Sequence, residues 1–126
     1  MTIITPSYRV NNLIEIKKST SFECIDEWMI VYDGNKIKSN PCIFQGNNKI
    51  KEYVYKGEGI SGNPQRNYAL TKIINPNTLF YYLDGDNILH PNLYKLLDNI
   101  WYFASPPYRR PRVRSLASHK CSQVEK

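Results

Sequence analysis

Short apolar runs that end in polar turns recur along most of the chain. Trp28–Tyr32 and Leu79–Leu83 are continuous apolar runs, too short for helices and typical of strands buried on both faces. Ile3-Ile4 and Ile50–Tyr55 predict two further strands. Strands of this kind are common in parallel sheets, so the pattern predicts one mostly parallel sheet with flanking helices.

Helical periodicity appears between the strands. Val10, Leu13, Ile14 and Lys17 recur at helical spacing and predict a helix from Val10 to about Thr20. A second helix follows the third strand, with Asn63 as its N-cap and Pro64 at its first position. The apolar face expected for this second helix consists of Ala69, Leu70, Ile73 and Ile74.

Strands that alternate with helices predict an α/β domain over residues 1–104, with a mostly parallel sheet and flanking helices. Its last elements are a helix that begins at Pro91 and a strand at Trp101–Ala104. Residues 105–126 are rich in Pro, Ser and Arg without apolar periodicity, which predicts a disordered, basic tail.

The positive charge is concentrated in that tail. Residues 109–126 hold six of the 17 basic side chains and one of the 11 acids, so the body is almost neutral. A basic tail on a neutral body indicates an appendage, whereas a nucleic-acid-binding body would itself be basic. The three cysteines are too few and too scattered for a disulfide framework or a zinc site. With neither a leader nor an apolar run of membrane-spanning length, we expect a cytoplasmic protein with reduced thiols and no membrane span.

Acidic residues follow two of the predicted strands. Asp33 comes after the second strand, and Asp84 and Asp86 come after the fourth. Ligands of open parallel sheets bind outside the carboxyl ends of the strands. Two carboxylates around Gly85 could share Mg²⁺ or Mn²⁺ and thereby bind a diphosphate. Asp-Gly sequences are also ordinary turn formers, so the pattern leaves a purely structural role open.

Two further features bear on ligand binding. Arg66 falls in the first turn of the second helix, where a cation opposes the helix dipole. It therefore either contacts an anion or is simply solvated. Gly57–Gly62 imitates a Gly-x-Gly-x-x-Gly loop but follows the third strand instead of the first, which argues against a dinucleotide site.

Four segments, taken in order, resemble family 2 glycosyltransferases with the GT-A fold. The first is similar to the Pro-(Ser/Thr)-Tyr-Asn end of the opening strand, with Arg9 in place of Asn. The second is similar to Val-Asp-Asp-Gly with Tyr32 in place of the first Asp, and the third resembles the Ala-Arg-Asn helix start. The fourth resembles the Asp-x-Asp metal motif. The segments are Ile3–Arg9, Val31–Gly34, Gln65–Asn67 and Tyr82–Asn87.

The resemblance implies a Rossmann-like GT-A half domain that binds a nucleotide-diphospho-sugar. It implies that Thr5, Pro6 and Tyr8 line the nucleobase pocket, that Asp33 contacts the base and that Arg66 faces the nucleotide.

The resemblance also implies that Asp86 binds the divalent cation, Mn²⁺ or Mg²⁺, which bridges the donor's diphosphate. Asp84 would lie near the ribose or in the water shell of the metal. A UDP-sugar is the expected donor, and the acceptor, a glycan, lipid or protein, is not identified.

The resemblance ends before the part of the family that supplies the acceptor site and, in inverting members, a general base. After Asp98 the chain has one acid, Glu125. No catalytic residue is therefore assigned, and we expect a truncated half of a glycosyltransferase that self-associates or takes its acceptor site from a partner chain. The alternatives are a non-catalytic donor-binding module and a nucleic-acid or anionic-surface binder that acts through the basic tail.

Overall fold

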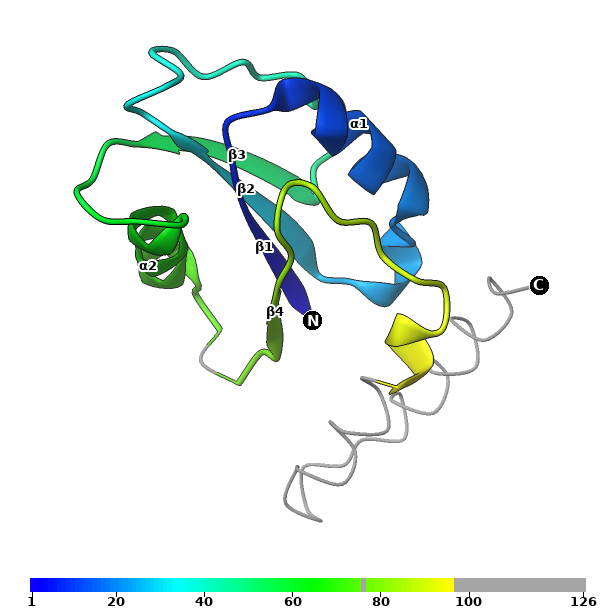
Figure 1. Cartoon of the computed structure of the whole chain (residues 1–126). Coiled ribbons are helices and arrows are strands. Elements are labelled where there is room, and N and C mark those ends of the chain that lie inside the picture. Colours follow the sequence, from blue (N-terminus) through cyan, green and yellow to red (C-terminus); the bar gives the residue numbers. More distant parts are fainter. Residues whose placement is uncertain (76, 97–126) are drawn as a thin grey trace.

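The computed structural model describes residues 1–75 and 77–96, which form one parallel four-stranded sheet in the order β3-β2-β1-β4. Helices α1 and α2 lie on opposite faces of this sheet (Figure 1). The expected α/β class with a parallel sheet and flanking helices is confirmed. The elements are β1 Thr2–Ser7, α1 Val10–Ser19, the 3-10 turn η1 Phe22–Cys24, β2 Glu27–Asp33, β3 Ile50–Tyr55, α2 Asn63–Lys72 and β4 Phe80–Tyr82.

The two central strands divide their side chains between two apolar clusters. Ile3 of β1 and Trp28 of β2 pack on the α1 face, whereas Ile4 and Met29 pack on the α2 face with Ala69. This alternation follows from the period of two in a strand. Strand β2 is buried along its whole middle, as its uninterrupted apolar run predicts.

Helix α1 covers one face of the sheet with a stripe that differs from the predicted one. Its buried residues are Leu13 and Ile16. Leu13 of the predicted stripe is buried and Val10 packs partly buried against the same cluster, but Ile14 is 45% exposed and its place in the stripe is wrong. Val10 and Ile14 are at helical spacing, and so are Leu13 and Ile16, but Ile14 and Ile16 lie on different sides of the helix. The orientation of the helix on the sheet selects Ile16.

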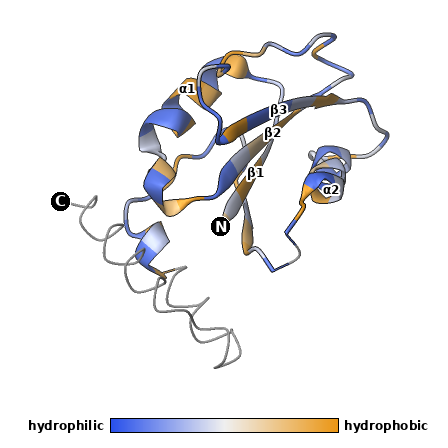
Figure 2. Ribbon diagram, turned by 180° about the vertical axis from the view of Figure 1, so that it is seen from behind, coloured by the Kyte–Doolittle hydropathy of each residue, from blue (hydrophilic) through white to orange (hydrophobic). Residues whose placement is uncertain are grey.

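Helix α2 begins one residue earlier than expected, because Gly62 occupies the N-cap in the left-handed region at φ 77°. Half of the predicted apolar face is confirmed, since Ala69 is buried and Ile73 packs partly buried against the same cluster. Leu70 is 37% and Ile74 96% exposed, so their places in that face are wrong, and the other buried residue of the helix is Gln65. Figure 2 shows how hydrophilic this helix is. It ends at Lys72, which leaves Ile74 outside the packed surface.

Strand β4 is shorter and more exposed than its sequence predicts. It pairs with β1 only through Phe80–Tyr82, and Phe80 and Tyr82 are both more than 40% exposed. The expected buried five-residue strand is therefore wrong. Helix α2 packs mainly against β1, β2 and β3, so within the described residues no helix covers the aromatic side chains on that face of β4.

The chain beyond β4 returns to the α1 face. Leu89 and Tyr94 join the cluster under α1, and the Tyr94 hydroxyl accepts a hydrogen bond from the Ser21 amide at 2.8 Å. The predicted last strand at Trp101–Ala104 and the tail at 105–126 lie outside the described residues. Within the described ranges, no helix is long and apolar enough to span a membrane.

The expectation of reduced thiols holds at one described cysteine and fails at the other. Cys42 is free and exposed. Cys24 is disulfide-bonded, so the expectation is wrong there.

Candidate functional site

Strands β1 and β4 are neighbours at the point where the chain changes from one face of the sheet to the other. From β1 the chain passes through α1 to β2, and it reaches β4 through α2 on the opposite face. At such a switch point the two connections diverge and leave a crevice outside the carboxyl ends of the strands.

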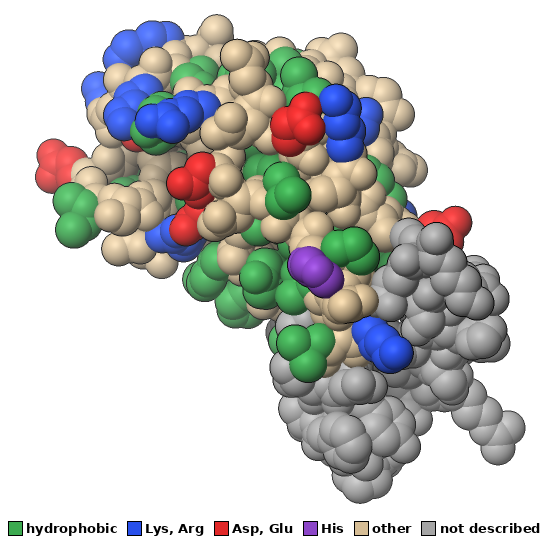
Figure 3. Space-filling view, turned by 45° about the vertical axis from the view of Figure 1, so that its right-hand side comes forward, with side chains coloured by type: hydrophobic (Ala, Val, Ile, Leu, Met, Phe, Trp, Pro, Cys, Tyr) green, Lys and Arg blue, Asp and Glu red, His purple; other side chains and the backbone are tan. Residues whose placement is uncertain are grey.

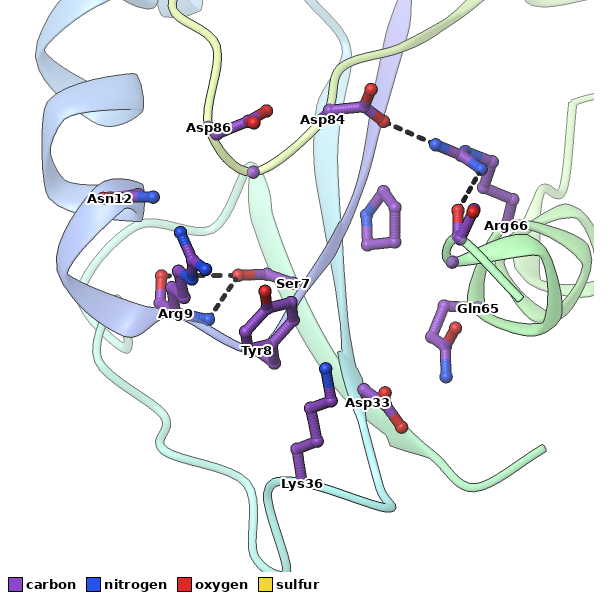
Figure 4. A pocket seen from close by; sticks show the side chains of 14 residues that line it. Ser7, Tyr8, Arg9, Asn12, Asp33, Lys36, Gln65, Arg66, Asp84 and Asp86 are labelled. Carbon is purple, nitrogen blue, oxygen red and sulfur yellow. Dashed lines mark hydrogen bonds and ion pairs between the residues drawn. The ribbon is translucent and has the colours of Figure 1, made fainter. Parts of the chain in front are cut away.

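A cleft of about 410 Å³ lies at this crevice. It contains six of the seven residues to which the sequence assigns a binding role, and Figure 4 shows their side chains around one space. These six come from segments far apart in the chain, so the topology of the sheet brings them together. They are Pro6, Tyr8, Asp33, Arg66, Asp84 and Asp86.

A proline is tolerated at position 6 of β1 because β4 no longer pairs with β1 there. The backbone carbonyl of Ile4 points toward β4, where it accepts a hydrogen bond from the Leu83 amide. Backbone groups alternate in direction along a strand, so those of Pro6 point to the same side as those of Ile4. Strand β4 ends at Tyr82, opposite Ile4, so Pro6 has no ladder partner there that would need its missing amide. The turn after β4 instead passes close to the Pro6 carbonyl, which lies 3.3 Å from the place of a Cβ on Gly85.

Thr5 does not line the cleft. Its side chain is fully buried, and its hydroxyl accepts a hydrogen bond of 2.9 Å from Nε1 of Trp28. The side chain implied to face a nucleobase therefore satisfies the indole donor of the core, and only its neighbours Pro6 and Ser7 reach the cleft.

Arg66 is held by groups on two sides of the cleft. Its Nη1 donates to the Ser61 carbonyl at 2.7 Å and to Oδ1 of Asn63 at 3.0 Å, and its Nη2 donates to Oδ1 of Asp84 at 2.5 Å. The guanidinium also lies over the ring of Tyr82. Arg66 thus joins the start of α2 to the turn after β4, and its side chain is only 20% exposed.

Asp86 lines the cleft without a hydrogen bond or ion pair to any residue in the described ranges. No group of three or more His, Cys, Asp or Glu that could enclose a metal ion occurs among the described residues. The available donors, Asp86 with Asp84 beside it, still fit Mg²⁺ or Mn²⁺, because such ions are often held by one or two carboxylates together with phosphate and water.

Asp33 ends β2 with a local turn. Its Oδ1 accepts a hydrogen bond of 2.9 Å from the Asn35 amide, and its backbone carbonyl accepts from the amides of Lys36 and Ile37. This turn fixes the carboxylate at the lip of the cleft. The turn-forming role that the sequence left open is therefore present, and it leaves Oδ2 available to a ligand donor.

Two basic side chains of the cleft received no binding role from the sequence. Arg9 and Lys36 both lie over the ring of Tyr8, with 5.0 Å from Arg9 Cζ and 3.7 Å from Lys36 Nζ to the ring centre. The available signal was the basic Arg9 at a position where the resembled motif has Asn. Lys36 carried no signal, because its position depends on the turn after β2.

The charges of the cleft are balanced. Three basic side chains, Arg9, Lys36 and Arg66, stand with the three aspartates. Both signs also occur on the face of the molecule shown in Figure 3. The shifted pKa values belong to groups outside the cleft, where burial is the largest cause. It raises the pKa of Glu27, Tyr32, Tyr53 and Tyr94.

No protein-family model, curated protein or solved structure matches this chain. The cleft is a partly apolar crevice that contains an aromatic ring, basic side chains and carboxylates at the carboxyl ends of parallel strands.

Proposed function

We propose that this chain binds a nucleotide-diphospho-sugar in the cleft and that it is a glycosyltransferase or the donor-binding part of one. The observation that carries the proposal is the convergence of six residues from four segments into one 410 Å³ cleft. Those four segments are the ones that resemble the family 2 motifs, and the cleft lies where α/β sheets bind nucleotides.

The chemistry of the cleft suits such a donor. Tyr8 and Pro6 offer apolar surface to a nucleobase or ribose, and the carboxylate of Asp33 can accept a hydrogen bond from either. Asp86 and Asp84 would hold Mg²⁺ or Mn²⁺, which supplies charge stabilisation to the departing nucleoside diphosphate when it is bound. Arg66 positions Asp84 through their ion pair.

Calorimetric titration of the purified chain with UDP, with and without Mn²⁺, tests the proposal. We expect Mn²⁺ to strengthen binding and Asp86→Asn to abolish that gain, with a loss of about tenfold or more. Glu58→Gln is the matched control, since it removes one negative charge from an exposed residue that does not line the cleft. A folded chain that binds no nucleoside diphosphate under either condition would overturn the proposal.

A second assay separates a transferase from a non-catalytic donor-binding module. Slow hydrolysis of a bound UDP-sugar, followed as release of UDP, indicates the transferase. Binding without release favours the module, in which a partner chain would supply the acceptor site. Titration with ADP, GDP and CDP then identifies the preferred base.

A further inference from the structure

The charged groups of Arg9 and Lys36 are available to a ligand. Neither the Arg9 guanidinium nor the Lys36 ammonium makes a hydrogen bond or ion pair within the described part of the chain, although both lie over Tyr8. A contact with an aromatic face restrains a cation and leaves N–H groups free to donate. The cleft therefore contains two positioned cations with unused donors.

Arg66 differs from these two cations. Three of its N–H groups already donate to Ser61, Asn63 and Asp84, and the pairing with Asp84 offsets its charge. An anion entering the cleft would have to compete with Asp84 for this guanidinium. Arg66 therefore stabilises the shape of the cleft, and Arg9 and Lys36 are the side chains that can bind an anion.

The two free cations come from different elements and meet at one aromatic side chain. Arg9 directly precedes α1, and Lys36 lies in the turn after β2. Figure 4 shows them on either side of Tyr8, with Asp84 and Asp86 on the other side of the cleft. A diphosphate in this space would face cations on one side and the carboxylate turn on the other.

We propose that Arg9 and Lys36 form a phosphate-binding subsite that holds the diphosphate of the ligand without a divalent cation. The ligand class rests on the proposed function, but the resemblance to glycosyltransferases implies no role for either residue. An arginine binds two phosphate oxygens through parallel N–H groups, and a lysine contributes a compact charge. Because Arg66 offsets Asp84, the carboxylates repel the diphosphate less than their number suggests.

The test is calorimetric titration of the full chain in EDTA with UDP, inorganic diphosphate and uridine. We expect UDP and diphosphate to bind and uridine to bind at least roughly tenfold more weakly than UDP, because a charged hydrogen bond supports about a tenfold change. Arg9→Gln and Lys36→Met should each weaken binding of UDP and of diphosphate by a similar factor. Lys36→Arg, which keeps the charge, should retain most of the affinity.

Lys38→Met is the matched control for Lys36→Met. Lys38 lies in the same turn region and is exposed, and among the described residues its ammonium donates only to the Asn35 carbonyl, at 3.5 Å. We expect the Lys38→Met variant to bind diphosphate with the affinity of the wild type. Circular dichroism and the thermal midpoint confirm that each variant is folded before it is titrated.

The outcomes separate this inference from the proposed function. If UDP binds only with Mn²⁺ and both single variants bind it as the wild type does, the cationic subsite is wrong and the donor site stands. A second outcome is that the wild type binds diphosphate in EDTA, the variants do not, and no nucleotide binds better than diphosphate. In that case the subsite stands and the nucleotide-sugar proposal is wrong. If the folded wild type binds none of the three compounds in EDTA, the subsite is overturned.

Discussion

Arg66 and Asp84 form an ion pair across the cleft, with 2.5 Å between Nη2 and Oδ1. The two residues are 18 positions apart and belong to the start of α2 and to the turn after β4. Their contact closes one side of the crevice at the switch point of the sheet. It also fixes the orientation of a carboxylate for which the resemblance implied a place near the ribose or in the water shell of the metal.

The first prediction concerns this pair. Arg66→Lys keeps the charge but cannot reach Ser61, Asn63 and Asp84 together, so UDP affinity should fall by about fivefold to tenfold. Stability should change by less than about 1 kcal/mol, because the Asp84 side chain is 55% exposed and solvent screens the pair. A double-mutant cycle with Asp84→Asn, measured by calorimetry and urea unfolding, checks both values. Additive effects on affinity would contradict a coupling between the two side chains.

Gly62 provides the second prediction. Its φ of 77° is unfavourable for other residues, and a Cβ at Gly62 would lie 2.9 Å from the Cβ and Cγ atoms of Pro6. Gly62→Ala should therefore destabilise the fold by about 2 kcal/mol and disturb the cleft. Gly46→Ala is the control, since nothing lies within 4 Å of its Cβ position. Urea unfolding compares the two, and equal stability of both variants would refute the explanation.

Thr5 provides a prediction that separates a core role from a ligand role. Thr5→Val should leave Nε1 of Trp28 without its partner and destabilise the fold by about 1–3 kcal/mol. The affinity of the remaining folded protein for UDP should not change, because Thr5 does not line the cleft. Titration below the unfolding transition checks this, with Thr5→Ser as the variant that keeps the hydroxyl. A selective loss of affinity at unchanged stability would restore the predicted ligand role.

Tyr32 provides a prediction of pH dependence. Its hydroxyl donates to Oε1 of Glu52 at 2.7 Å, and burial followed by this hydrogen bond raises the pKa of Tyr32. The folded state therefore favours the protonated phenol. The stabilisation that the Tyr32 hydroxyl gives the folded state is fully present below the unfolded pKa of about 10, and it is lost as the pH rises above that value.

Tyr32→Phe should accordingly lower stability at pH 7 by about 1–2 kcal/mol through loss of the hydrogen bond to Glu52. Between pH 9 and 11 the free energy of unfolding should fall less for the Tyr32→Phe variant than for the wild type. Urea unfolding across this range measures both effects. Tyr55→Phe serves as the control, because no hydrogen bond of the Tyr55 hydroxyl occurs in the described structure. A variant with the same alkaline slope as the wild type would contradict the assignment.

The exposed apolar side chains near β4 lead to the last prediction. Ile74 is 96% exposed, and Phe80 and Tyr82 form an exposed aromatic pair on β4. We expect concentration-dependent self-association of the wild type, which Ile74→Lys reduces while changing stability by less than about 0.5 kcal/mol. Ile60→Lys is the control, since Ile60 is 77% exposed on a different loop. Sedimentation velocity decides, and a monomeric wild type at all concentrations would contradict the expectation.

The sequence predicted most elements of the fold because their signals are local. The run Trp28–Tyr32 specified a buried strand, Ile50–Tyr55 matched β3 residue for residue, and the periodicity after Val10 located α1. It failed where burial depends on neighbours. The pair Val10 and Ile14 and the pair Leu13 and Ile16 both have helical spacing, and only packing on the sheet selected Ile16 over Ile14. The apolar residues of β4 gave no indication that α2 would pack on the other three strands.

The candidate site divides in the same way. The sequence by itself determined which polar residues follow the ends of strands, because a turn such as that at Asp33 is fixed by residues two or three apart. Only the tertiary structure decided that Thr5 bonds Trp28, that Arg66 pairs with Asp84, and that Arg9 and Lys36 meet at Tyr8. These contacts join segments separated along the chain, and their formation depends on the strand order β3-β2-β1-β4, which no local pattern specifies.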